Sequence, residues 1–215
     1  NSFSQDNPYS TEDQLIRSKA VERMEYWRNY REPTPSVTIR QEPSYGSAIS
    51  TTLRSSYKTL SLSEVHSMPN VSMRVRDEYG FSGHSIINHN YNFKTIGGDK
   101  VVVDKATGLM WHQNGSDSSM RYKTVKKWIR KLNKRGYAGY QDWRLPTVDE
   151  AVSLLEPSKK NKEYDVDLEW TILYIDPFFS GELMIWTGDE CEDGSEAAWG
   201  VSFYHGGVSW DDIYG

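Results

Sequence analysis

This sequence has a single cysteine, no long hydrophobic run and no excess of positive charge. Cys191 is the only cysteine, so no disulfide forms within the chain and packing has to stabilise the fold. No run of about 18 apolar residues occurs, which excludes a membrane-spanning helix. The net charge of -5 excludes a globally basic nucleic-acid-binding protein, although a local basic patch is compatible with it.

The signatures of common enzymes are missing as well. The sequence has no GxSxG, no phosphate-binding P-loop and no GxGxxG, and its histidines are not spaced as in HExxH. The acidic residues around Cys191 oppose the formation of a reactive thiolate. We therefore predict a protein that is not an enzyme and has no cofactor.

The composition favours one compact domain together with a less densely packed region. Hydrophobic residues make up 37% of the chain, and the mean hydropathy is -0.72. Seven of the eight tryptophans follow residue 110, which places an aromatic-rich core in the C-terminal half.

The first 35 residues predict a helix. Thr11, followed three residues later by Gln14, forms a capping-box pattern, and apolar residues recur at helical spacing until the prolines that follow. The predicted helix spans residues 12–31, and its narrow apolar stripe would be marginal alone in water. We therefore expect Ile16, Met24 and Trp27 to bind a partner surface.

Residues 36–98 predict an extended arm or linker. The stretch is rich in Pro, Ser, Thr and Gly and has no sustained period, apart from a short helical segment capped by Ser61 or Ser63. We expect its later part to wrap the following domain rather than form its centre. The aromatic anchors would be Tyr79, Phe81, Tyr91 and Phe93.

Residues 99–215 predict a compact α+β domain. A hairpin turns near Gly108, and apolar residues at i, i+3, i+4 and i+7 from residue 125 predict a helix that ends near Gly136. A capping box of Thr147 and Glu150 begins a second helix, which ends before Pro157. Further strands are predicted at residues 183–187, 199–204 and 208–210, after a charged loop at residues 159–167.

Five sequence blocks carry a resemblance to a known family. They are ATGLMW (106–111), GYQDWRLPTVDEAVSLLEP (139–157), IDPFF (175–179), IWTGD (185–189) and AAWGVSFYHGGVSWDD (197–212). Together they resemble the family typified by the C-terminal domain of the Legionella collagen-like protein. The resemblance implies a C-type-lectin-like fold with two helices and a twisted antiparallel sheet. It also implies bacterial, often exported proteins that act through binding, including glycosaminoglycan contact and trimer formation in the type member.

The resemblance has two further implications. The family has no shared catalytic apparatus, and the related formylglycine-generating enzymes need more than one reactive cysteine, so a single thiol argues against that activity. The family continues after the terminal hairpin with a strand resembling YVRAVR, whereas this chain ends at Gly215. Either that strand is not included, or a partner supplies it at an open sheet edge.

The DWRLPT block predicts a folding corner, with a ligand-binding role as the alternative. Pro146 prepares the entry into the helix capped by Thr147, and the residues before it can pack on either side. We expect Asp142 and Arg144 to pair across the turn. The structural motif comprises Trp111, Asp142, Trp143, Arg144, Leu145, Pro146, Thr147, Trp186 and Trp199.

Two charged segments are candidates for binding. Residues 189–196 could wrap a calcium ion, with a solvated acidic loop as the alternative, and the EPN tripeptide of calcium-dependent lectins is absent. Residues 121–135 are strongly basic and could attract an anionic partner, with a merely solvated surface as the alternative. The metal candidates are Asp189, Glu190, Glu192 and Asp193. The candidates for anion binding are Lys126, Lys127, Arg130 and Lys131.

These features predict a binding or structural protein. The leading hypothesis is an accessory or organising subunit of a multi-protein assembly, which contacts other subunits or copies of itself through the N-terminal helix and arm. The alternative is a surface receptor that binds anionic glycan through the basic helix. No apolar stretch near Asn1 is typical of a signal peptide. Because the sequence starts at Asn1 without Met, we expect either an extracytoplasmic protein whose leader has been removed or a chain whose upstream residues are missing.

Overall fold

A computed structural model describes residues 52–77, 80–116, 120–157, 161–165, 169–179, 184–192 and 196–213 of the protein. The chain divides into two units, Asn1–Gly46 and Ser47–Gly215, and every described residue belongs to the second. The predicted N-terminal helix, with Ile16, Met24 and Trp27, lies outside the described residues.

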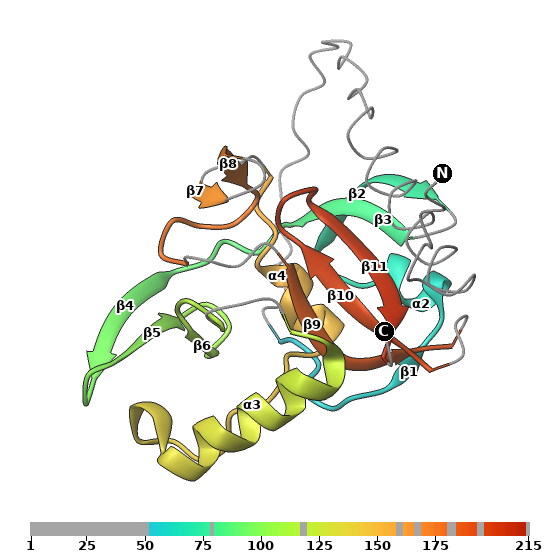
Figure 1. Ribbon diagram of the computed structural model, residues 1–215. Helices are drawn as coiled ribbons and strands as arrows, with labels where there is room; N and C mark the ends of the chain where they lie inside the picture. The colour runs from blue at the N-terminus through green and yellow to red at the C-terminus, as the bar shows by residue number, and fades with distance from the viewer. Residues whose placement is uncertain are drawn as a thin grey trace, which may run out of the picture. The chain divides into compact units, whose positions relative to one another are not determined.

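The described part of the chain contains short helices and many strands (Figure 1). The helical segments are α2 (Leu62–His66), α3 (Tyr122–Arg135), η1 (Tyr137–Gly139) and α4 (Val148–Ser153). The first strands are β1 (Thr59–Leu60), β2 (Val71–Asp77), β3 (Gly80–Ser85), β4 (Tyr91–Ile96), β5 (Asp99–Asp104) and β6 (Met110–His112). The later strands are β7 (Asn161–Asp165), β8 (Glu169–Leu173), β9 (Met184–Cys191), β10 (Ala197–Ser202) and β11 (Gly207–Asp212). Among the described helices, none combines the length and apolar character needed to cross a bilayer.

The main sheet has six strands in the order β1-β9-β10-β11-β3-β2. Its pairs are antiparallel except for β1, which runs parallel to β9. This mixture of few helices and mostly antiparallel sheet is the α+β class expected from the sequence. Strands from residues 59–85 therefore share one sheet with strands from residues 184–212. The predicted boundary between arm and domain, at residue 98, separates strands that belong to this same sheet.

The segment around β3 is part of the core, whereas the sequence suggested that it wraps the domain. Phe81 is fully buried, and β3 pairs directly with β11. Gly80 allows this close approach, because a Cβ atom at its φ of +145° would lie 1.9 Å from the carbonyl oxygen of Val208. The glycines and serines of this strand lack the alternation of large apolar residues by which a strand is usually predicted.

The core of the main sheet is built from both halves of the described chain. Trp199 and Phe203 are fully buried, and α4 packs against β9, β10 and β3. Leu60 and Val65, which precede the predicted domain, belong to the same cluster. Residues 59–66 are therefore held by the chain's own domain.

The predicted helix ends are confirmed where they depend on local signals. Ser61 and Glu64 form a capping box at α2, and Thr147 and Glu150 form one at α4. Helix α3 ends at Arg135 and is capped by Gly136, which adopts the left-handed conformation with φ of 68°. Helix α4 ends at Ser153, sooner than Pro157 suggested, because the next two residues turn into the core.

Two smaller sheets complete the described part. The predicted hairpin forms as β5 and β6, and β4 joins it to give the order β4-β5-β6. Its buried Val101 clusters with Leu132 of α3 and Tyr137 of η1. Strands β7 and β8 form a separate hairpin, and β7 lies within residues 159–167, where a charged loop was predicted. That prediction was wrong because backbone pairing does not require an apolar side-chain pattern.

Candidate functional site

Helix α3 is oriented by the apolar stripe predicted from the sequence. Tyr122 and Leu132 are buried. Trp128 packs on the cluster around Val101, and Val125 packs on a second cluster around Leu145 and Ala198. These contacts on one side of the helix fix which of its residues face outward.

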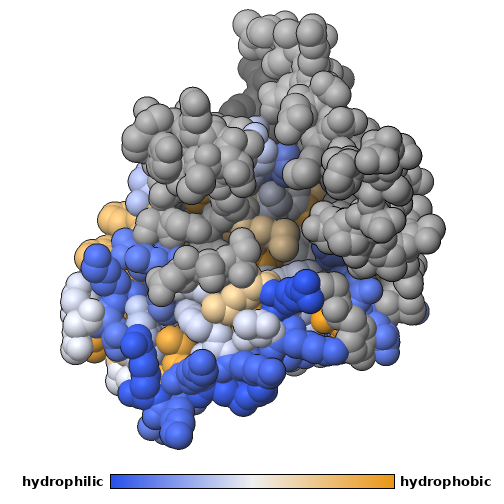
Figure 2. All heavy atoms as spheres, viewed as in Figure 1, coloured by the Kyte–Doolittle hydropathy of each residue, from blue (hydrophilic) through white to orange (hydrophobic). Residues whose placement is uncertain are grey.

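The outward face of α3 carries a stripe of cations, which we call the basic face. Its members are Lys123, Lys126, Lys127, Arg130, Lys131 and Lys134. They stand at i, i+3, i+4, i+7, i+8 and i+11, so they share one side of the helix over about 17 Å. All six are exposed, and Figure 2 shows strongly hydrophilic side chains along the lower edge of the molecule, where Figure 1 places α3.

The charges of the basic face are not neutralised by the helix itself. Residues 122–135 contain seven of the chain's 25 Lys and Arg and no Asp or Glu. Within the described part of the chain, Lys127, Arg130 and Lys131 form no ion pair. Arg135, at the end of the helix, pairs with Asp99 at 3.0 Å. The face is therefore a concentrated positive field on a chain of net negative charge.

Asp189, a predicted metal candidate, is instead a structural carboxylate. Its side chain is fully buried and accepts four hydrogen bonds at 2.6–2.8 Å, two from the Arg54 guanidinium and one each from the backbone N–H of Lys58 and Val148. Four bonds use about all the acceptor positions of a carboxylate. Asp189 therefore serves the fold and has no lone pair left for a cation.

The two other metal candidates that the structure describes, Glu190 and Glu192, do not form a metal site with Asp189. Glu190 and Glu192 are exposed, and Asp193 lies outside the described residues. No group of three His, Cys, Asp or Glu in the described ranges is arranged to hold a metal ion. Cys191 is buried in the main core, opposite Leu60 of β1.

The DWRLPT corner, residues 142–147, is built differently from the prediction. Arg144 does not pair with Asp142. Its guanidinium binds both carboxylate oxygens of Glu150, at 2.6 and 2.7 Å. Glu150 is almost fully buried at the first turn of α4, where its capping bond to Thr147 N turns the carboxylate back toward the corner. The hydrogen bond to Glu150 raises the pKa of Arg144 above its usual value.

The remaining motif residues pack around this corner. Asn133 of α3, which the sequence did not single out, bonds both the N–H and the C=O of Trp143 at 2.8 Å. Leu145 is buried, and Trp186 donates its indole N–H to the carbonyl of Met120. The corner therefore ties α3 to the start of α4. Trp111 packs on the main core, and Pro146 accepts a bond from the backbone of Gly188.

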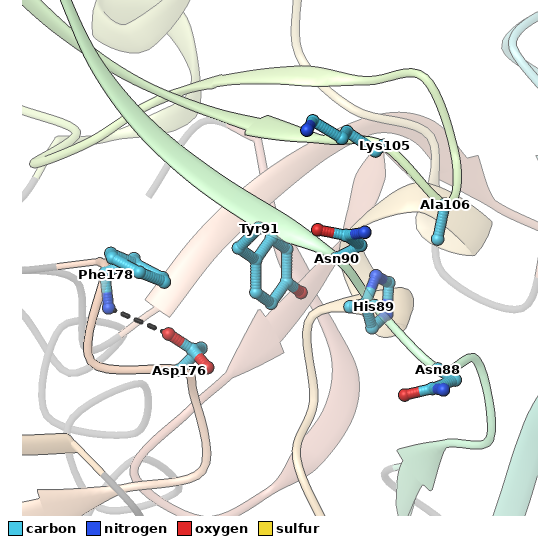
Figure 3. A pocket seen from close by; sticks show the side chains of 8 residues that line it. All are labelled: Asn88, His89, Asn90, Tyr91, Lys105, Ala106, Asp176 and Phe178. Atoms are coloured by element: carbon cyan, nitrogen blue, oxygen red, sulfur yellow. Dashed lines mark hydrogen bonds between the residues drawn. The ribbon is translucent and has the colours of Figure 1, made fainter.

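A polar cavity of about 550 Å³ lies between the start of β4, the turn after β5 and the loop after β8 (Figure 3). In its wall, His89 Nδ1 lies 2.7 Å from Asp104 and Nε2 lies 2.6 Å from the carbonyl of Ser153. Both partners are hydrogen-bond acceptors, so each ring nitrogen of His89 faces an acceptor within the fold. The lining residues are Asn88, His89, Asn90, Tyr91, Lys105, Ala106, Asp176 and Phe178.

Asp104 does not itself line the cavity but is the structural partner of His89, which does. Burial raises the pKa of Asp104, but hydrogen bonds from Thr107, His89 and two backbone N–H groups outweigh it, so the pKa lies below its usual value. Both nitrogens of His89 are engaged within the fold, which leaves neither for proton transfer to a ligand. The sequence could not indicate this pair, since His89 lies in the loop before β4 and Asp104 lies at the end of β5.

Comparison with known proteins places the corner and α3 in one family domain. The sequence model of a family described as the Lcl C-terminal domain matches residues 100–214. Neither curated proteins nor solved structures match the chain significantly. The matched range begins within β5 and ends beyond β11, so β1 to β4 and α2 precede it.

Proposed function

Because the chain belongs to the Lcl C-terminal domain family, we propose that it is a non-catalytic binding protein that holds an anionic partner on the basic face of α3. The observation that carries the proposal is the exposed stripe of six cations along one side of a helix that contains no carboxylate. We further propose that the domain has a C-type-lectin-like fold, in keeping with its short helices and mostly antiparallel sheet.

The physics of the basic face favours an extended polyanion such as a sulfated glycan. A single exposed ion pair contributes only about 0.2–1 kcal/mol. A polymer that meets several cations at once adds these contributions and releases the counterions that the face holds. The net charge of -5 makes the rest of the surface unfavourable for such a polymer, which directs it to α3.

Charge reversal on the basic face tests the proposal. A variant with Lys127, Arg130 and Lys131 each replaced by Glu should lose retention on immobilised heparin at low salt. Lys126 is left in place because its ammonium lies 4.3 Å from the ring centre of Tyr122 and supports the helix. The wild-type protein should be retained and should elute as the salt concentration rises.

A matched variant separates a specific face from general charge. Lys58, Lys94 and Lys105 are exposed and lie outside α3, so replacing all three by Glu changes the net charge by the same amount. This control should elute with the wild type. Equal loss of retention in both variants, or in neither, would contradict the proposal.

An organising role in a larger assembly remains a prediction from the sequence. Ile16, Met24 and Trp27, on which it depends, lie outside the described residues. Because residues 59–66 pack on the chain's own domain, the need for a partner surface now concerns the residues before 52. The mass of the native protein, and of whatever co-purifies with it, tests this role.

A further inference from the structure

Residues 54–60, which we call the strap, lie across the DWRLPT corner and along the edge of β9. Five of the seven, residues 55–59, are exposed, so most of the strap rests on the surface and only its last residue, Leu60, enters the core. It is held at three positions spaced three residues apart, Arg54, Tyr57 and Leu60.

The first anchor is Arg54, which fills an acidic notch formed by Asp149 and Asp189. Its guanidinium lies 2.6 Å from Asp149 and 2.7 and 2.8 Å from the two oxygens of Asp189. The hydroxyl of Thr147 donates to the Arg54 carbonyl at 2.7 Å. Two carboxylates thus converge on one cation, a geometry that suits the planar fork of arginine better than the point charge of lysine.

The second anchor is Tyr57. Its hydroxyl donates to the carbonyl of Leu145 at 2.8 Å. Its ring lies on Gly188, where a Cβ atom would come within 2.1 Å of the ring. Gly188 therefore leaves room for an aromatic side chain, although its backbone angles do not require glycine.

The third anchor is the short strand that ends in Leu60. The carbonyl of Lys58 accepts from Glu190 N at 3.0 Å, and the carbonyl of Leu60 accepts from Glu192 N at 3.0 Å and from the indole N–H of Trp199 at 3.2 Å. The sheet edge binds the backbone of the strap while separate groups of the corner bind its Arg54 and Tyr57 side chains, as in peptide recognition by strand addition.

The polar groups named above that bind the strap lie within residues 145–199, inside the family-matched range, whereas the strap itself precedes that range. We propose that the corner is a recognition site for an extended peptide with arginine and tyrosine three residues apart, and that the chain's own strap is its resident ligand. A second copy of this chain presents the same segment and is the partner that fits. In cis, the strap has an effective concentration on the order of millimolar, so a free peptide competes poorly with it.

The test uses the full chain with Arg54→Ala and Tyr57→Ala, which frees two anchors and leaves Leu60 in the core. The probe is a fluorescent peptide of residues 51–57, TTLRSSY. We expect saturable binding to the double variant, at least tenfold weaker binding to the wild type, and at least tenfold weaker binding of a peptide with lysine in place of arginine. Arg135→Ala, which removes an exposed arginine from its pair with Asp99, is the matched control and should behave as wild type.

The proposal is overturned if the folded double variant shows no saturable binding, or if it binds the peptide no better than the wild type does. Should the double variant fail to fold, Arg54→Lys keeps a cation in the notch and takes its place. That variant should bind the arginine peptide more tightly than the wild type, and equal affinities would refute the site. Heparin retention is unaffected by either result, so this test and that of the basic face are independent.

Discussion

Truncation of Phe81 to alanine tests whether the folding unit begins before the family-matched range. Phe81 is fully buried between β3 and the main core, and its ring meets the edge of His66 with 5.7 Å between ring centres. Removing a buried phenylalanine ring costs about 3–5 kcal/mol through lost burial and the cavity left behind. For a unit of this size the melting temperature should fall by about 6–20 °C.

Phe93→Ala is the matched control for this measurement. Phe93 is also an aromatic residue of an early strand, β4, but it is 37% exposed. Its truncation should cost clearly less than that of Phe81, because more than a third of its surface is already exposed to water and less buried area is lost. Urea unfolding followed by tryptophan fluorescence would give both values, with unchanged slopes confirming that one transition is compared. If the two variants lose the same stability, β3 is not part of the cooperative unit and its place in the sheet is wrong.

Three further predictions concern contacts that the structure shows. Arg144→Ala leaves the buried Glu150 carboxylate without its bidentate partner and should lower the free energy of unfolding by about 2–3 kcal/mol. The loss is smaller than for a fully buried pair because Arg144 is partly exposed. If urea titrations show no loss of stability, the pairing is refuted. The folded-state pKa of Asp104 lies below its usual 3.8, so its contribution to stability is present above that pH and is lost as the pH falls through the folded value. The stability gap between wild type and Asp104→Asn should therefore stay constant from about pH 5 to 7 and close below about pH 4, and a gap that widens in acid would contradict this sign. Gly80→Ala should destabilise the protein by about 3 kcal/mol or more in thermal melts, since its Cβ atom would overlap the carbonyl oxygen of Val208; a variant as stable as wild type would argue against the β3–β11 pairing.

Local signals in the sequence were enough to predict α2, α3, α4 and the family. Two helices begin with capping boxes, at Ser61 and Thr147, and α3 is followed by a capping glycine. The groups that interact in these caps are only three or four residues apart, so they can be predicted from the local sequence. The amphipathic stripe of α3 likewise determines that its cations face outward. The basic face was therefore accessible from the sequence alone, and the DWRLPT block led to the family that the comparison confirmed.

Contacts across long separations were decided only by the tertiary structure. Asp189 looked like a ligand in an acidic loop until Arg54, 135 residues away, was found to neutralise it. His89 and Asp104, and the entry of Phe81 into the core, depend in the same way on strands brought together by folding. A sequence records the charge and size of each side chain but not its partner. The partner is set by sheet register and packing. Short strands that are rich in glycine and serine show no hydrophobic periodicity in the sequence from which this register could be predicted.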